Sequence, residues 1–288
     1  MNNHMNHMGH SQDATFFALW RPDIFLIVVL LGALYFYFIG KGRGRFQDAK
    51  PVSGKQKFWM VMALLTLYFG QGSPINYYGH SLLFSSHMTQ MSLMYLVFPP
   101  MVYAGLPDWM IASVLRKPFV KKWVYPFSQP LLALFLFNMM FSFYHIPYIF
   151  NAVTASSWGH LTYHWVLVFV SFQMWFPIFV TIPGWNRISD LQRLGYIFAI
   201  GVLLTPACAL IIFAKTQLYD PYLNAPQLIS WLPSIDDQQL GGVIMKIIQE
   251  IVYGTILAVT FFRWYRTEKA KEADMDAAFL ERSQLPTS

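Results

Sequence analysis

The chain has 288 residues, of which 56% are hydrophobic and 12% are charged, and a formal net charge of +6. This composition, with 26 Phe, 16 Tyr and 10 Trp, is too apolar for a soluble domain and indicates a membrane protein. The single cysteine, Cys208, excludes an intrachain disulfide and a CxxC redox pair. The basic residues gather in alternate loops rather than on one face, so nucleic acid is excluded as a partner.

Seven apolar segments follow one another along the chain, each bounded by charged residues or by Pro and Gly. A membrane helix needs about 20 apolar residues to cross about 30 Å of hydrocarbon. In chain order the segments are 23–39, 58–69, 82–103, 127–146, 158–180, 194–214 and 240–262. They predict an all-α membrane protein, a bundle of seven transmembrane helices in a lipid bilayer.

The Lys and Arg residues predict the orientation of this bundle. All but Arg21, Lys215 and Lys246 of the 20 basic residues lie after the first, third, fifth or seventh segment. Cytoplasmic loops are enriched in Lys and Arg. We therefore expect a cytoplasmic C-terminus and an N-terminus outside.

Three regions follow from this topology. We expect an extracytoplasmic His/Met-rich tail over residues 1–20, a seven-helix membrane domain over 21–266 and a polar, mobile cytoplasmic tail over 267–288. The first 20 residues lack a basic stretch before an apolar core, so the first helix is expected to be a retained signal anchor. Pro99 and Pro100 should bend the third helix, and residues 215–239 should form an irregular loop or a short surface helix.

All eight histidines fall outside the membrane or in its outer half under this topology. Methionines lie near several of them. Imidazole with thioether suits copper, with Cu(I) favoured, and is a poor ligand set for Mg²⁺ or Ca²⁺. For any single histidine the alternative is a hydrogen bond between helices. The predicted ligands within the membrane domain are His80, His87, Met88, Met91, His145, His160 and His164.

Helical spacing divides these ligands. His160 and His164 are four residues apart, as are His87 and Met91, so each pair shares a helix face. On one continuous helix His80 would lie about 10 Å from His87 along the axis. We therefore expect the two pairs to hold the ion, with His80 and His145 as upper partners.

Other groups with ligand chemistry lie outside these pairs. The N-terminal tail has the composition of a metal-binding tract, although accidental composition or an added segment also explains it. Cys208 offers a thiolate for Cu(I), or simply packs as a small apolar residue. Asp237 caps the last helix, or docks a cuprous ion or a cationic partner. The predicted tail ligands are His4, Met5, His7, Met8 and His10.

Two charged residues, Lys246 and Glu250, are four apart inside the last segment. An unpaired charge at mid-membrane costs about 2.5 to 3.5 kcal/mol on insertion scales. We expect them to pair or to face the bundle interior. The sequence shows no nucleotide loop, nucleophile motif or acid–base pair, so an enzyme is not predicted.

Several stretches of the chain resemble the CtaG family, polytopic cytochrome c oxidase assembly factors of the Gram-positive type. The resemblance covers nearly all of the chain after Trp20. One difference is Met91, where family members often carry His, and a Met favours Cu(I) further. The matching stretches are GHSLLFSSHMTQM (79–91), FSFYHIP (141–147), the His160/His164 pair, LLTPACALIIF (203–213) and DQQLGGVIMKIIQEIVYG (237–254).

The resemblance implies a role in maturing a haem-copper oxidase in the bacterial cell membrane by delivering copper. The implied partners are oxidase subunit I or II and an extracytoplasmic copper donor, and a homodimer stays open. Two alternatives remain. A copper importer would need ligands that continue to the cytoplasmic face, and a haem-binding redox protein would use paired histidines.

Overall fold

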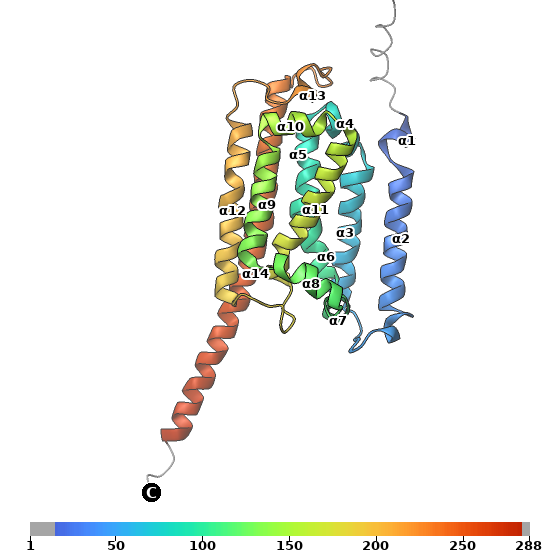
Figure 1. The fold of residues 1–288 in the computed structure, drawn as a ribbon. Helices are drawn as coiled ribbons and strands as arrows, with labels where there is room; N and C mark the ends of the chain where they lie inside the picture. Colours follow the sequence, from blue (N-terminus) through green and yellow to red (C-terminus); the bar gives the residue numbers. More distant parts are fainter. Residues whose placement is uncertain (1–14, 284–288) are drawn as a thin grey trace, which may run out of the picture.

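The computed structural model describes residues 15–283, and within that range its regular structure is entirely helical. Figure 1 shows long helices running side by side, with short helices at both ends of the bundle. The predicted all-α class is therefore confirmed.

The long helices make up the bundle, and the short ones connect them. One bundle element is a continuous helical stretch in three parts, α5 (Phe84–Ser92), the π-helical η2 (Leu93–Val97) and α6 (Phe98–Gly105). The other long helices are α2 (Pro22–Ile39), α3 (Gly54–Gly72), α9 (Pro130–Tyr144), α11 (Ser157–Phe179), α12 (Asp190–Ile212) and α14 (Ser234–Ser283). The short helices are α1 (Phe16–Leu19), η1 (Arg43–Arg45), α4 (Pro74–Ser81), α7 (Asp108–Leu115), α8 (Pro118–Phe127), α10 (Pro147–Thr154) and α13 (Asp220–Leu223).

Four helices of the described chain are long and apolar enough to cross a membrane. They are α2, α11, α12 and the part of α14 from Ser234 to Ala277. The number rises to six if α3 with α4, bent by 41°, and α8 with α9, bent by 68°, each form one span. Every predicted segment contains a helix, whereas the count of seven spans and the orientation of the termini stay predictions.

The bundle has two chemically different ends. In Figure 1, η1, α7 and α8 lie at the lower end, and α4, α10 and α13 lie at the upper end. We call the lower one the basic end, since its connections carry most of the Lys and Arg. We call the upper one the histidine end, since His80 and His145 lie there.

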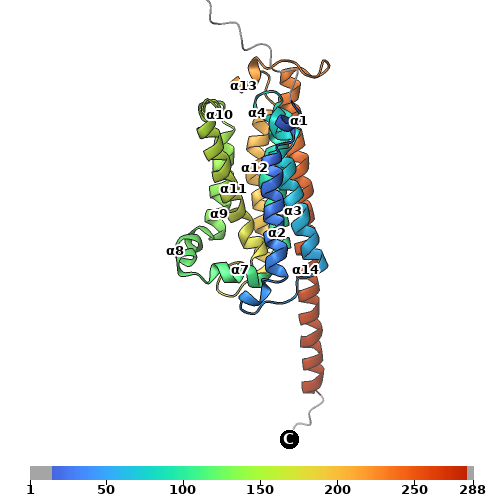
Figure 2. The same ribbon diagram turned by 90° about the vertical axis from the view of Figure 1, so that its right-hand side faces the viewer.

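The helices are packed unevenly. The most extensive helix contact is between α12 and α14, and α14 also packs along α5. By contrast, α2 lies at the edge of the bundle against α3, with only Gly32, Tyr35 and Ile39 buried. Figure 2 shows the same arrangement from the side, with α8 projecting beyond the other helices.

Pro99 and Pro100, predicted to bend the third helix, follow a π-helical turn, and the helix then continues to Gly105. A proline has no N–H to donate, so the preceding turn loses part of its hydrogen bonding. The Tyr95 carbonyl instead accepts bonds from Ser171 Oγ at 2.5 Å and Trp175 Nε1 at 3.0 Å. These two bonds tie η2 to α11.

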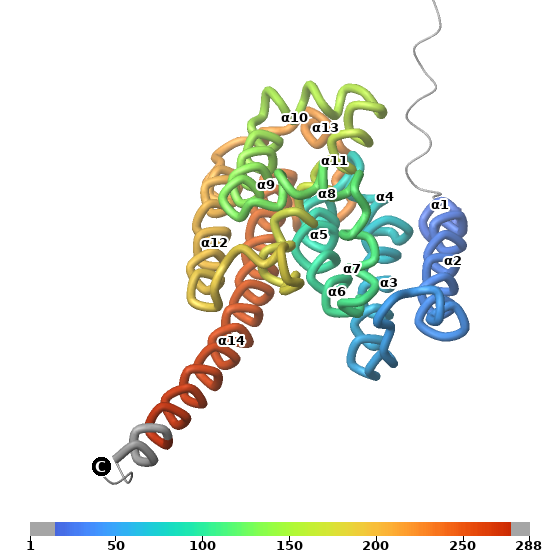
Figure 3. Tube along the Cα trace, turned by 60° about the horizontal axis from the view of Figure 1, so that its bottom comes forward, coloured from blue at the N-terminus to red at the C-terminus, as the bar shows by residue number. Residues whose placement is uncertain are grey.

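The last helix differs from its prediction. Residues 267–283, expected to be a mobile tail, continue α14 as one helix that projects beyond the basic end (Figures 1 and 3). Its sequence there lacks Gly and Pro and alternates acidic and basic residues, which favours a solvated helix. The connection before α14 is largely irregular and holds the short α13, as predicted.

Candidate metal site

The chain turns sharply between α4 and α5, so His80 and His87 lie on different helices. A Cβ on Gly79 would lie 2.8 Å from the His87 backbone nitrogen, so α4 crosses α5 directly at His87. The expected 10 Å separation assumed one continuous helix, and that assumption was wrong. The crossing brings the two histidine positions together.

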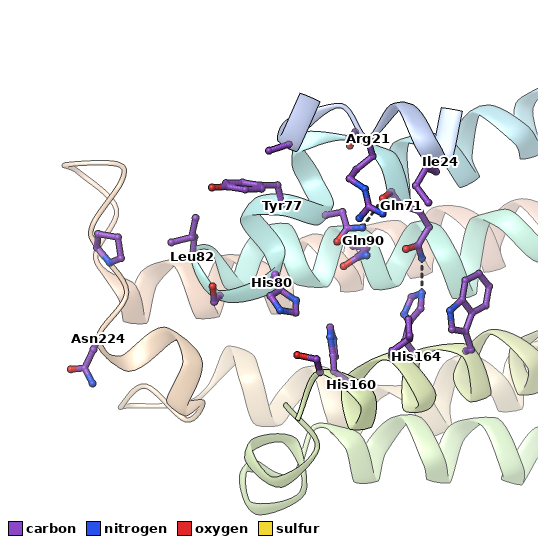
Figure 4. A pocket seen from close by; sticks show the side chains of 18 residues that line it. Arg21, Ile24, Gln71, Tyr77, His80, Leu82, Gln90, His160, His164 and Asn224 are labelled. Carbon is purple, nitrogen blue, oxygen red and sulfur yellow. Dashed lines mark hydrogen bonds between the residues drawn. The ribbon is translucent and has the colours of Figure 1, made fainter. Parts of the chain in front are cut away.

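The ring of His160, near the start of α11, lies beside both of these histidines. Its centroid is 5.2 Å from that of His80 and 6.2 Å from that of His87. In Figure 4 the side chains of His80 and His160 point toward each other across the gap between α4 and α11. His160 is therefore the centre of a group of three imidazoles.

The predicted partner of His160, His164, has other contacts. Gln71 Nε2 lies 2.5 Å from its Nε2, and the Tyr95 hydroxyl lies 2.6 Å from its Nδ1 (Figure 4 shows the first contact). Both ring nitrogens are therefore in hydrogen bonds. The structure places His164 in the interhelical role that the sequence left open for any histidine.

Among the residues that the structure describes, two buried imidazole nitrogens have no hydrogen-bond partner, Nε2 of His87 and Nε2 of His145. His145 follows α9 and is fully buried, with its Nδ1 2.8 Å from the Phe141 carbonyl oxygen. Buried polar atoms are normally hydrogen-bonded, so an unpartnered nitrogen calls for an explanation. A bound metal ion is one.

Met88 and Met91 follow His87 on α5 and are buried in the main apolar core. A Cβ on Gly241 of α14 would lie 3.0 Å from Met88 Cγ, so α14 approaches α5 closely here. The two thioethers thus lie within one helical turn of His87 and are shielded from solvent.

Asp237 caps a helix, although not its own. Its carboxylate accepts a 2.6 Å bond from the Phe84 backbone N–H and bonds from both the N–H and the hydroxyl of Ser85. These groups form the first turn of α5, whose own N-cap residue, Leu83, has no side-chain acceptor. A carboxylate at this end of a helix also complements the helix dipole. Asp237 therefore holds the turn that precedes His87.

Two tyrosines of the α12–α14 connection hold the backbone around the histidines, and no sequence pattern points to either. The Tyr222 hydroxyl donates to the Gly79 carbonyl at 2.6 Å, and the Tyr219 hydroxyl donates to the His145 carbonyl at 3.0 Å. Burial raises the pKa of Tyr222 well above its ordinary value, so its hydroxyl stays a neutral donor.

The remaining predicted ligands lie elsewhere. Cys208 is buried between α12 and α14, with its Sγ 3.9 Å from Gln249 Oε1. In residues 15–283 no three His, Cys, Asp or Glu side chains are grouped closely enough to ligate one ion. The predicted tail ligands His4, Met5, His7, Met8 and His10 lie outside the described residues.

A cavity of about 1040 Å³ opens beside the histidines, between the N-terminal helices, α4 and α11. His80, His160 and His164 line it together with polar side chains that include Arg21, Gln71 and Asn76 (Figure 4). The cavity gives solutes a route to the imidazoles of His80 and His160, while His87 stays buried behind them.

These features define a helical membrane protein with buried imidazoles at one end. The sequence model of the cytochrome c oxidase caa3 assembly factors matches residues 33–267. The chain belongs to this family, and the resemblance stated above is confirmed.

Curated relatives add little about activity. An uncharacterized protein of Mycobacterium leprae is 25% identical over 88% of this chain and 40% of its own length. Uncharacterized proteins of Mycobacterium bovis and Mycobacterium tuberculosis are 25% identical over 90% of this chain and 42% of their own lengths. The chain thus spans about two fifths of these relatives. No solved structure matches it.

Proposed function

We propose that this protein is a cytochrome c oxidase assembly factor that binds Cu(I) between His160 and either His80 or His87 and delivers it to the oxidase. Membership of the caa3 assembly factor family supports the assembly role. The position of His160 between the other two imidazoles carries the copper part of the proposal.

The ring separations fit shared coordination. A metal–imidazole bond is about 2.0 Å and the ring centre lies about 1.2 Å behind the nitrogen, so two rings on one ion have centres up to about 6.4 Å apart. The observed 6.2 Å between His87 and His160 suits a nearly linear pair, and the 5.2 Å between His80 and His160 suits a bent one. Each pair can hold an ion after small rotations of the rings.

The surroundings favour Cu(I) over harder ions. Met88 and Met91 offer soft thioethers near His87, and the nearby Asp237 carboxylate is already used by the first turn of α5. Soft sulfur and imidazole ligands select Cu(I), whereas Mg²⁺ and Ca²⁺ need oxygen. Ligation would also give the unpartnered His87 nitrogen a partner.

Delivery requires that the bound copper ion can dissociate from the protein. Few protein ligands and a cavity beside His80 and His160 favour exchange over permanent binding. In the proposed topology of seven spans the histidine end faces outward, where oxidase subunit I or II receives copper. The tail residues His4 to His10 and an extracytoplasmic donor are the proposed sources of the ion.

Copper binding by the purified protein tests the proposal. His160→Gln should lower the affinity for Cu(I) at least about tenfold, because it removes the imidazole common to both pairs. His164→Gln is the matched control, since a glutamine preserves polar contacts to Gln71 and Tyr95 and should leave affinity within about twofold. Equal loss in both variants, or none in His160→Gln, overturns the copper site.

Oxidase from cells that lack the protein tests the assembly role. We expect its copper content to fall, and His160→Gln to reproduce that loss while His164→Gln does not. Normal oxidase copper in the deletion strain overturns the role. A Soret band in the purified protein would favour the haem alternative.

A further inference from the structure

The charged pair in the middle of α14 lies on the outside of the bundle. Lys246 Nζ is 2.7 Å from Glu250 Oε1 and donates to Thr205 Oγ1 of α12 at 3.2 Å. The predicted pairing is confirmed. However, the Glu250 side chain is 64% exposed, so it does not face the bundle interior.

In a bilayer that α14 spans, Glu250 lies far from both membrane surfaces. It is 13 residues from Asp237 at the histidine end and 13 residues from Arg263 at the basic end, or about 20 Å in each direction at 1.5 Å per residue. An exposed carboxylate at that depth faces hydrocarbon, and a group so placed is costly unless something satisfies it. Lys246 Nζ approaches Glu250 at Oε1, and the Glu250 side chain remains 64% exposed beside this contact.

The face of α14 around Glu250 is shaped for another helix. Ile247 and Ile251 are exposed beside it, and Gly254 and Ala258 follow one and two turns below on the same side. A Cβ on Gly254 would meet no atom of this protein within 4 Å. Small residues at such spacing let two membrane helices approach closely.

An apolar groove of about 520 Å³ continues this face toward the basic end. Ile251, Thr255 and Val259 line it from α14, and α6 and α11 form its other walls. Arg263 lies at its lower end. The groove adds apolar contact area directly next to the polar position.

We propose that this face of α14, formed by Ile247, Glu250, Ile251, Gly254 and Ala258, docks a membrane-spanning helix of the oxidase that carries a hydrogen-bond donor at mid-bilayer depth. The donor bonds the exposed Glu250 carboxylate, and the close approach over Gly254 buries both groups. A lipid does not satisfy this position, because its polar groups lie at the membrane surface. The inference rests on the proposed assembly role and not on copper binding.

Photo-crosslinking in cells tests the surface, with a photoreactive residue at Ala258 and, as the control, at Phe198, an exposed position on α12. We expect a crosslink from position 258 to a membrane subunit of the oxidase, and none from 198. A crosslink only to a second copy of this chain, only to lipid, or to no oxidase subunit overturns the inference.

Two substitutions make the test specific. Gly254→Ile should lower the recovered oxidase subunit at least about tenfold by blocking the approach, and Glu250→Gln should lower it by a smaller factor. Gly195→Ile is the matched control, since a Cβ on Gly195 of α12 also meets nothing within 4 Å. Unchanged recovery in Gly254→Ile overturns the surface. Copper binding should stay normal in all three, so failure here is distinguishable from failure of the copper site.

Discussion

The histidine end and the middle of α14 both place polar groups in apolar surroundings, but they differ in where a missing partner can come from. His87 Nε2, which has no partner among residues 15–283, is buried within the bundle, whereas the Glu250 carboxylate is exposed on its outside. An enclosed group can be satisfied only by something small that enters. An exposed group in a membrane can be satisfied by another helix.

Substitutions around His87 and around Glu250 should have different effects. The surroundings of His87 are tightly packed at Gly79 and Gly241, and Asp237 caps the helix there. Substitutions at these positions should therefore reduce both stability and ligand binding. Around Glu250 the space is open, so changes that keep the charge balance should cost association alone.

The largest expected effect is that of Asp237→Ala. It leaves the buried N–H groups of Phe84 and Ser85 without an acceptor, which should reduce the free energy of unfolding by about 3 kcal/mol. Thermal unfolding in detergent measures it. Asp236→Ala is the control, since that exposed neighbour should contribute about 0.5 kcal/mol through the helix dipole. Equal losses would contradict the cap.

Next is Lys246→Met, which leaves Glu250 as an unpaired carboxylate facing hydrocarbon and should cost about 2 kcal/mol of stability. Adding Glu250→Gln to it should restore most of that loss, because the uncompensated charge is gone. The double variant should still associate poorly with the oxidase. No recovery in the double variant would show that the pair itself stabilises the fold.

Gly79→Ala should have an intermediate effect on stability, about 1.5 kcal/mol, because its Cβ would meet the His87 backbone at 2.8 Å. By moving α4 away from α5 it should also lower Cu(I) affinity about tenfold. Gly195→Ala, where the Cβ has open space, is the control for both measurements. Unchanged affinity in Gly79→Ala would separate His80 from the site.

The smallest effect should be that of Tyr222→Phe, which removes the hydroxyl donor to the Gly79 carbonyl and should cost about 1 kcal/mol. Tyr148→Phe is the control, because that residue is 83% exposed. A loss of the same size in both would show that the bond to Gly79 contributes nothing.

The existence of the helices was predictable, and some of their ends were not. Hydropathy located a helix in every segment, because about 20 apolar residues have few other solutions in a membrane. The segment 82–103 begins within two residues of α5 at Phe84, but the separate helix α4 before it and the crossing of the two helices were missed. The cap of α5 comes from Asp237, 153 residues from Phe84 in the sequence, and only the fold brings them together.

The histidine roles divide in the same way. Spacing on single helices grouped His160 with His164, but Gln71 and Tyr95 from other helices engage both nitrogens of His164. Helical spacing likewise assigned His80 and His87 to separate positions, whereas the crossing of α4 and α5 at Gly79 brings them together. Spacing describes one helix at a time, and a site between helices depends on how they pack.

Hydropathy and local motifs are properties of contiguous residues, so the amino-acid sequence alone identifies a helical membrane protein of the assembly factor family. It also determined that its imidazoles gather in a few segments. The tertiary structure decided which imidazoles adjoin one another and which side of α14 bears Glu250. Both depend on contacts between residues far apart in the chain, which no local pattern encodes.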